Sequence, residues 1–282
     1  MTEKRDKPGL AFLPHDWIRP LARIGYASRG VVYVIIGFFA VLSGLGTQGN
    51  KDSRGALRTI LEQPFGKVLI GILILGLVGL VIWRLIQSLL DTDSHGWSPK
   101  GLAVRGGLLA SAITYSLLTT YALSLVGLLA FARSDSSPSI ADRLAGVIGT
   151  KPVLIIMLLV FSGVALSHWY KAVTCGYAKH LRTEDAPMEY VHPISIAGLT
   201  ARGSVFAIIA VLLFYRIMTY SPSETQAPGL DEALAFVQQL PFGAFLLVLL
   251  GCGLMMFAAY SFIEAIWRRI NVEDAEMEEQ LE

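Results

Sequence analysis

The sequence predicts an all-α polytopic membrane protein with six transmembrane helices, arranged as three tandem two-helix repeats with short amphipathic outer-surface helices. Three observations predict this fold class. Apolar residues make up 54% of the 282 positions and charged residues only 16%, which is too apolar for a soluble domain of this length. Six apolar runs are each long enough to cross about 30 Å of hydrocarbon as a helix. Short motifs also recur at corresponding places along the chain.

The apolar runs lie near residues 27–46, 66–90, 107–131, 152–175, 200–219 and 242–267. They divide the chain into a cytoplasmic N-terminal segment (1–20), three repeats of two transmembrane helices each (21–92, 100–180 and 194–270) and an acidic cytoplasmic tail (271–282). Most of the 23 Lys and Arg residues flank these runs on the side that also carries both ends of the chain. Because Lys and Arg are retained in cytoplasmic loops, we expect both termini in the cytoplasm.

Internal repetition is clearest between the first and third helix pairs. The first pair opens with Ile-Gly-Tyr-Ala-Ser-Arg-Gly at 24–30, and the third opens with Ala-Gly-Leu-Thr-Ala-Arg-Gly at 197–203. In both pairs Pro-Phe-Gly precedes the second helix, at 64–66 and at 241–243. The middle pair lacks the Arg-Gly and the Pro-Phe-Gly motifs, so it is the most diverged of the three predicted repeats.

Between the two helices of each repeat lies a polar segment in which apolar residues recur at helical spacing, at 56–61, 141–148 and 230–237. Each segment predicts a short amphipathic helix on the outer surface. Such a helix closes the loop and covers the end of the bundle, or it gates a path, and the sequence leaves both roles open. The first helices also carry small residues, which let helix backbones approach closely in lipid: Gly25, Gly30 and Gly37, then Gly107, Ala112 and Thr119, then Gly198, Gly203 and Ala210.

Three stretches of the first repeat resemble a known family. They are Gly-Tyr-Ala-Ser-Arg-Gly at 25–30, Gly-Ala-Leu at 55–57 with the following Pro-Phe-Gly, and Trp83-Arg84. They resemble the repeated pattern of the bacterial membrane family catalogued as Domain of Unknown Function 1206, and the resemblance extends from about Leu21 to Ile270. The resemblance implies a multi-pass protein of the bacterial inner (plasma) membrane, built from three tandem repeats. It supplies no catalytic residue.

The candidate functional residues are polar side chains near the cytoplasmic ends of the second helices, because an ionisable group within a membrane span is costly unless it faces water or a partner. Aligned by repeat, Arg84, His168 and Ser261 form one layer, and Gln87, Lys171 and Glu264 form the next. The candidates for substrate binding or proton coupling are therefore Glu264, Lys171, His168, Gln87 and Arg84. In this hypothesis Lys171 and Glu264 form a charge pair, and His168 binds substrate or carries a proton.

An alternative role for the basic members is anchoring. Arg84, Lys171 and Arg268 lie near the inner boundary, where long basic side chains extend to the headgroups and fix the topology. Arg29 and Arg202 occupy equivalent places in the first and fifth helices and are candidates for lipid or anion contact. A carboxylate adds nothing to such anchoring, so Glu264 fits this alternative least well.

Two functions from different classes remain open. Three helix pairs around a central path, in a three-fold pseudo-symmetric bundle, predict a transporter or channel for a small solute of unknown identity. Short loops without a large soluble domain predict a non-transporting membrane scaffold or accessory subunit. The expected partners are the lipid bilayer, a small solute, and further copies of this chain or another membrane protein. The net charge of +1 gives no sign of a nucleic-acid partner.

Motifs of the common enzyme classes are absent from the sequence. There is no paired-His zinc motif, no Gly-x-Ser-x-Gly elbow and no phosphate-binding Gly-rich loop followed by Lys. Only His168 lies within an apolar run, which disfavours a haem with two axial histidines. We therefore expect no enzymatic activity, and hence no catalytic residue, metal site or cofactor.

Overall fold

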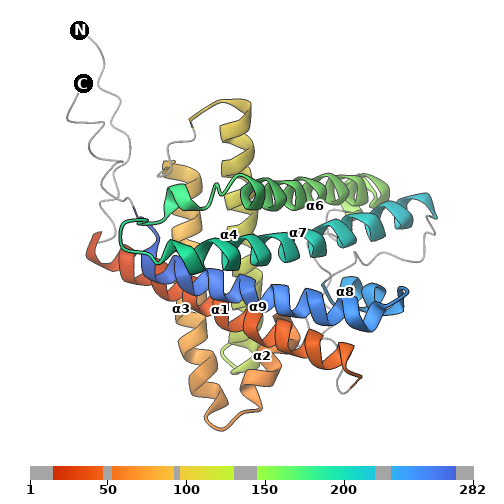
Figure 1. The fold of residues 1–282 in the computed structure, drawn as a ribbon, viewed down its shortest axis with the longest axis horizontal. Helices are drawn as coiled ribbons and strands as arrows, with labels where there is room; N and C mark the ends of the chain where they lie inside the picture. Colours follow the sequence, from red (N-terminus) through yellow and green to blue (C-terminus); the bar gives the residue numbers. More distant parts are fainter. Residues whose placement is uncertain (1–14, 47–52, 92–95, 130–144, 220–229, 271–282) are drawn as a thin grey trace.

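The computed structural model describes residues 15–46, 53–91, 96–129, 145–219 and 230–270 (Figure 1). Within these ranges the chain is helical, and its β-structure is limited to one isolated bridge. Six of the described helices are long and apolar enough to cross a membrane: α1 (His15–Gly44), α3 (Gly66–Leu90), α4 (Pro99–Leu125), α6 (Thr150–Val173), α7 (Met188–Met218) and α9 (Gly243–Trp267). The prediction of an all-α protein with six long apolar helices is confirmed.

Three of these helices begin well before the apolar runs that predict them. α1 begins at His15 instead of near residue 27, α4 begins at Pro99 instead of near residue 107, and α7 begins at Met188 instead of near residue 200. The apolar pattern marks only the part of a helix that meets hydrocarbon, whereas the backbone hydrogen bonds continue through the polar flank. Pro20 and Pro193 lie inside the second turns of α1 and α7, so each leaves one backbone carbonyl oxygen of the first turn without its helical donor.

Two of the three predicted amphipathic helices are present, as α2 (Ser53–Leu61) and α8 (Leu230–Gln239). Their apolar faces are buried: Ala56 and Leu57 in α2, and Ala233 and Leu234 in α8, are all 0% exposed. Of the helix predicted over 141–148, residues 141–144 lie outside the described residues, and residues 145–148 are helical. A single turn of 3-10 helix, η1 (Ala178–His180), lies between α6 and α7.

The long helices pack in the order α4, α3, α1, α9, α7, α6, so α1 and α9 form the centre of the bundle. These two helices run antiparallel, because Gly44 lies against Ala244 and Gly37 lies against Gly251. A Cβ atom at Gly37 would come within 2.7 Å of the Gly251 carbonyl oxygen, so the glycine permits the close approach. The start of α1 and the end of α9 consequently lie at the same end of the pair.

The three helix pairs are not equivalent in the structure, which differs here from the predicted three-fold bundle. α1 packs on α3 and α9 packs on α7, but α4 packs chiefly on α3 and α6 chiefly on α7. Figure 1 shows α3 and α4 running across the direction of the other four long helices. A Cβ atom at Gly25 or Gly198 would lie 2.6 or 2.5 Å from a backbone nitrogen of the partner helix, whereas Gly107 has nothing within 4 Å. The middle pair therefore lacks the close backbone contact that joins the other two.

The same turn precedes α3 and α9. Phe65 and Phe242 both adopt the left-handed backbone conformation, with φ angles of 61° and 60°. A Cβ atom on the glycine that follows would collide with a carbonyl oxygen of the preceding chain, at 2.1 Å for Gly66 and 2.3 Å for Gly243. The Pro-Phe-Gly motif thus specifies a tight connection from a short helix into a long one, and only glycine fits its third position.

Candidate functional site

Four arginine side chains and one carboxylate lie close together inside the bundle, linked by ion pairs and by shared aromatic rings. We call this group the arginine cluster: Arg29 of α1, Arg84 of α3, Arg202 of α7 and Arg268 directly after α9, together with Glu264 of α9. Aromatic rings separate and support the guanidinium groups. Tyr115 of α4 and His168 of α6 also reach these surroundings, so all six long helices contribute to the site.

The Glu264 carboxylate binds two of the four guanidinium groups. Its Oε2 atom accepts a hydrogen bond from Arg29, and its Oε1 atom accepts one from Arg268. Arg29 Nε also donates to the Ser261 hydroxyl at 3.0 Å. The three charged side chains are only 3%, 4% and 7% exposed, so water screens the two ion pairs little. These contacts tie α1 to the end of α9.

The ring of Tyr26 lies among three of the guanidinium groups. The Cζ atoms of Arg29, Arg268 and Arg84 are 5.1, 5.3 and 5.6 Å from its centroid. The Tyr26 hydroxyl accepts a hydrogen bond from Trp83 Nε1 at 2.9 Å, which holds the ring in place. Because aromatic faces attract cations most strongly where water is excluded, the buried ring partly compensates for the concentrated positive charge.

A second ring, that of Phe257, brings in the fourth guanidinium group. The Cζ atom of Arg202 lies 4.4 Å from its centroid, and that of Arg29 lies 5.1 Å away. Tyr33 meets the same ring edge to face, with the two centroids 4.8 Å apart. Arg29 is therefore shared by both rings, and it connects Arg202 with the rest of the cluster.

Tyr115 connects α4 to the same cluster. The side chain is 8% exposed, and it interacts electrostatically with Arg202, Arg29 and Arg84. It also forms a side-chain hydrogen bond with Arg202. A phenol hydroxyl both donates and accepts hydrogen bonds, so Tyr115 adds a polar group from α4 to the surroundings of the arginine cluster.

The structure brings together three of the five side chains predicted for substrate binding or proton coupling. Glu264 and Arg84 are in the arginine cluster, and Gln87 is buried beside it, accepting a hydrogen bond from Arg84 Nη1 at 3.0 Å. His168 lies at the edge, where its Nδ1 atom is 2.8 Å from a backbone carbonyl oxygen of its own helix. Lys171 is exposed on α6. Two arginines therefore hold the Glu264 carboxylate, in place of the predicted Lys171.

The sequence predicts Arg29 and Arg202 as candidates for contact with lipid or an anion. Arg29 is 3% exposed and is ion-paired with the Glu264 carboxylate. Arg202 is half-buried, and its guanidinium group stacks over Phe257 inside the bundle. Arg29 and Arg202, which occupy equivalent positions in α1 and α7, thus lie in the same cluster.

The chain between α6 and α7 covers the end of α9, next to the arginine cluster. An isolated β-bridge pairs Leu181 with Arg268, and the Arg269 amide donates to the His180 carbonyl oxygen at 2.8 Å. Tyr177, just before η1, is 1% exposed, and burial raises the pKa of its hydroxyl group. These backbone contacts fix Arg268 in an extended conformation from which its side chain folds back onto Glu264.

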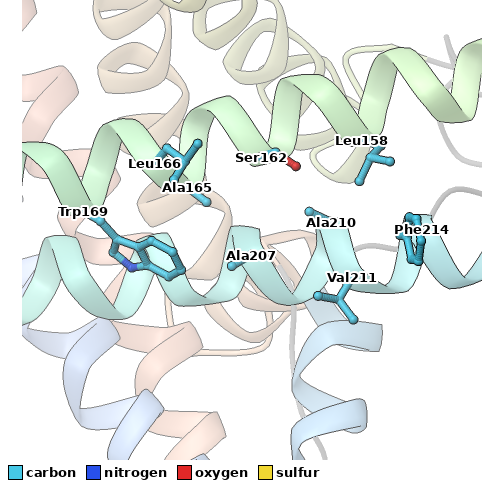
Figure 2. A pocket seen from close by; sticks show the side chains of 9 residues that line it. All are labelled: Leu158, Ser162, Ala165, Leu166, Trp169, Ala207, Ala210, Val211 and Phe214. Carbon is cyan, nitrogen blue, oxygen red and sulfur yellow. The ribbon is translucent and has the colours of Figure 1, made fainter.

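A groove of about 350 Å³ lies between α6 and α7 (Figure 2). Its lining is apolar apart from one hydroxyl and one indole nitrogen: Leu158, Ser162, Ala165, Leu166, Trp169, Ala207, Ala210, Val211 and Phe214. None of these residues belongs to the arginine cluster. The groove offers no charged group to a solute, so it does not account for the buried charges.

Sequence reasoning missed Tyr26 and Phe257, the two rings that connect the guanidinium groups. Their helical spacing relative to the polar residues could have indicated both rings. Tyr26 precedes Arg29 by one helical turn, and Phe257 precedes Ser261 and Glu264 on the same face of α9. Which helix faces would meet could not be read from this spacing, because it depends on how α1 packs against α9.

Comparison with known proteins identifies the family. Residues 24–91 and 197–268 match the family model described as Domain of Unknown Function (DUF1206). The chain is also 30% identical to the Uncharacterized protein YxxB of Bacillus subtilis (strain 168), over 263 residues that cover 91% of this chain and 94% of that protein. No solved structure matches the chain. The resemblance seen in the sequence is thereby confirmed, and the chain belongs to the family described as Domain of Unknown Function (DUF1206).

Proposed function

We propose that this protein is a transporter or channel for a small solute, and that the solute's path passes the arginine cluster. The observation that carries the proposal is the meeting of all six long helices at four guanidinium groups and one carboxylate, of which Arg29, Arg268 and Glu264 are buried. Ionisable side chains inside membrane spans are costly, and they mark substrate or ion pathways more often than structural contacts.

Stability alone is a weak reason for such a cluster. Replacing a buried ion pair by apolar residues of similar size is often neutral or stabilising, because desolvation offsets most of the attraction. Arg84 and Arg202 add two further positive charges that the single carboxylate does not bind directly. A functional role explains why charges are concentrated where Leu and Phe would pack at lower cost.

We infer that α1–α3 and α7–α9 are two copies of one repeat, with α4–α6 as a diverged middle copy. The family model matches the first and last thirds of the chain separately, at 24–91 and 197–268. The left-handed Phe65 and Phe242, and the close contacts at Gly25 and Gly198, occur at corresponding places in these two thirds. Two equivalent halves packed about α1 and α9 would place matching faces at a shared interior.

For the setting, we propose the bacterial inner membrane with both termini in the cytoplasm. The distribution of Lys and Arg supports this orientation. The antiparallel packing of α1 and α9 also supports it, because it puts the start of one and the end of the other at the same end of the bundle. In this orientation the arginine cluster lies toward the cytoplasmic side.

A non-transporting scaffold or accessory subunit is the second candidate. The close glycine contacts favour it, since backbones in van der Waals contact at Gly37 and Gly251 leave no space for a solute at that level of the α1–α9 interface. A path would therefore have to pass beside this interface, among α3, α4 and α7. The two candidates differ in whether water reaches the cluster.

Solute flux into liposomes tests the proposal. Vesicles holding the wild-type chain, Glu264→Gln or Arg23→Gln would be given a panel of labelled anions, cations and neutral solutes across an imposed pH gradient. We expect flux with the wild-type chain, at least a tenfold loss in Glu264→Gln, and no change in Arg23→Gln, whose side chain is exposed on α1. Equal leak in protein-free and protein-containing vesicles across the whole panel would overturn transport and favour the scaffold.

A further inference from the structure

Only two of the four arginines in the arginine cluster are ion-paired with its carboxylate. Both oxygens of the Glu264 carboxylate are bound, one by Arg29 and the other by Arg268. Among the described residues, the contacts of Arg84 and Arg202 are with neutral groups: Gln87 for the first, and aromatic rings with Tyr115 for the second. Among the described residues these two half-buried arginines thus have no carboxylate in ion-pair contact, although Arg84 also interacts electrostatically with Glu264.

Each of these two side chains also has a donor that points at no acceptor. The Nε atoms of Arg84 and Arg202 are buried, and neither has a hydrogen-bond partner. A buried donor left without a partner costs roughly 1–3 kcal/mol, and more when the group is charged. Proteins satisfy nearly all such groups, so these two donors call for an acceptor that the described residues do not supply.

The missing acceptor would lie next to the Tyr115 hydroxyl group. Tyr115 is the side chain that α4 contributes beside the arginine cluster, and Arg29, Arg84 and Arg202 all interact with it electrostatically. A group bound beside the Tyr115 hydroxyl would therefore meet three guanidinium groups from three helices, as well as a phenol donor. The rings of Tyr26 and Phe257 lie next to the guanidinium groups of Arg84 and Arg202, respectively.

We propose that Arg84, Arg202, Arg29 and Tyr115 form a binding site for an oxyanion, a phosphate or carboxylate group. The chemistry follows from the donors: planar guanidinium groups match two oxygens at once, and the excess positive charge requires a negative ligand. The site deepens the proposed function, on which it rests, by naming the class of the solute. The same oxygens occur on soluble anions and on the headgroups of acidic lipids, and binding experiments separate these two sources.

Equilibrium binding on the full-length chain tests the site without requiring transport. Radiolabelled inorganic phosphate and succinate serve as soluble probes for protein in neutral detergent. Nanodiscs of phosphatidylcholine, with or without phosphatidylglycerol, serve as the lipid probe, with the unfolding midpoint as readout. The variants are Arg84→Gln and Arg202→Gln, with Arg23→Gln as the matched control on an exposed arginine.

We expect phosphate or succinate to bind the wild-type chain, and the affinity to fall about 10- to 100-fold in each cluster variant, as for the loss of a charged hydrogen bond. Arg23→Gln should bind as the wild type does. Arg84→Lys and Arg202→Lys keep the charge but lose the two-pronged geometry, so their affinities should fall between those of wild type and the Gln variants. These Lys variants also separate a loss of binding from a loss of folding, which circular dichroism monitors.

If only phosphatidylglycerol stabilises the protein, and only when Arg84 and Arg202 are present, the site stands with a lipid headgroup as its ligand. Failure of phosphate, succinate and phosphatidylglycerol to bind would overturn the site, and so would equal binding by wild type and both Gln variants. Anion binding without flux would sustain the site and contradict transport. Flux of a cation or neutral solute without anion binding would support transport and overturn the oxyanion site.

Discussion

Replacing Glu264 by glutamine removes the only carboxylate that the described residues place in the arginine cluster, while keeping the size and shape of the side chain. Arg29 and Arg268 then keep their charge but lose its counterpart, at exposures of 3% and 7%. The amide oxygen of glutamine still accepts one hydrogen bond, so the loss is mainly electrostatic.

The expected cost follows from the burial of the pair. Breaking a buried ion pair by removing one partner costs about 3–5 kcal/mol, because the other charge stays buried and uncompensated. Here two guanidinium groups lose the same partner, which puts the cost toward the upper end. Contact with the ring of Tyr26, worth about 0.5–2 kcal/mol per cation, offsets part of it. We expect Glu264→Gln to lose about 4 kcal/mol of unfolding free energy.

A double-mutant cycle measures this cost in detergent micelles, by unfolding with sodium dodecyl sulfate followed by circular dichroism. Glu264→Gln, Arg29→Gln and the combined variant complete the cycle, and a coupling energy of about 2 kcal/mol or more is expected between contacting charges. Glu184→Gln is the matched control, because Glu184 pairs with Arg269 on the surface, where both side chains are about half exposed or more. The control should unfold as the wild type does. A coupling energy near zero, or equal behaviour of the two Glu→Gln variants, would refute the reasoning.

Three further predictions follow from single contacts. Gly25→Ala should lose about 1–3 kcal/mol of unfolding free energy, since its Cβ would lie 2.6 Å from backbone atoms of α3, whereas Gly71→Ala, with nothing within 4 Å, should lose none. Tyr26→Phe leaves Trp83 Nε1 buried without its acceptor and should cost about 1–3 kcal/mol in the same titration. Burial raises the pKa of Tyr177, so its contribution to stability is present below the unfolded-state pKa of about 10 and is lost as the pH rises beyond it. The unfolding midpoint of Tyr177→Phe should therefore fall less than that of the wild type between about pH 8 and about pH 11, and equal falls would contradict this.

The elements of the fold were predictable because length and hydropathy decide them. A run such as 66–90 is too long and too apolar for any alternative to a membrane-length helix, and α3 occupies those residues. The starts of α1 and α7 were not predictable in this way, since the helical backbone outlasts the apolar pattern. Nor was the packing order, because Gly25 and Gly107 look alike in sequence and only one of them meets another helix.

The sequence identified single polar side chains, such as Glu264, as site candidates. It did not predict which side chains of other helices they contact. Glu264 stood out because a carboxylate near the inner boundary has no anchoring role. Its pairing with Arg29 joins residues 235 positions apart, and no spacing rule reaches that far. Assigning Lys171 as the partner assumed three equivalent helix pairs around an axis, whereas α6 packs chiefly on α7 and leaves Lys171 exposed.

Water access to the arginine cluster tests the central claim most directly. Cysteines replacing Arg84, Arg202 or Leu75, in a chain whose Cys175 and Cys252 are changed to alanine, would be exposed in liposomes to an anionic, membrane-impermeant methanethiosulfonate. Leu75 is the control because its side chain is 67% exposed on the apolar face of α3, where lipid should cover it. A water-filled path predicts modification at 84 and 202, and none at 75. Positions 84 and 202 as unreactive as position 75, in protein that remains folded, would contradict the account.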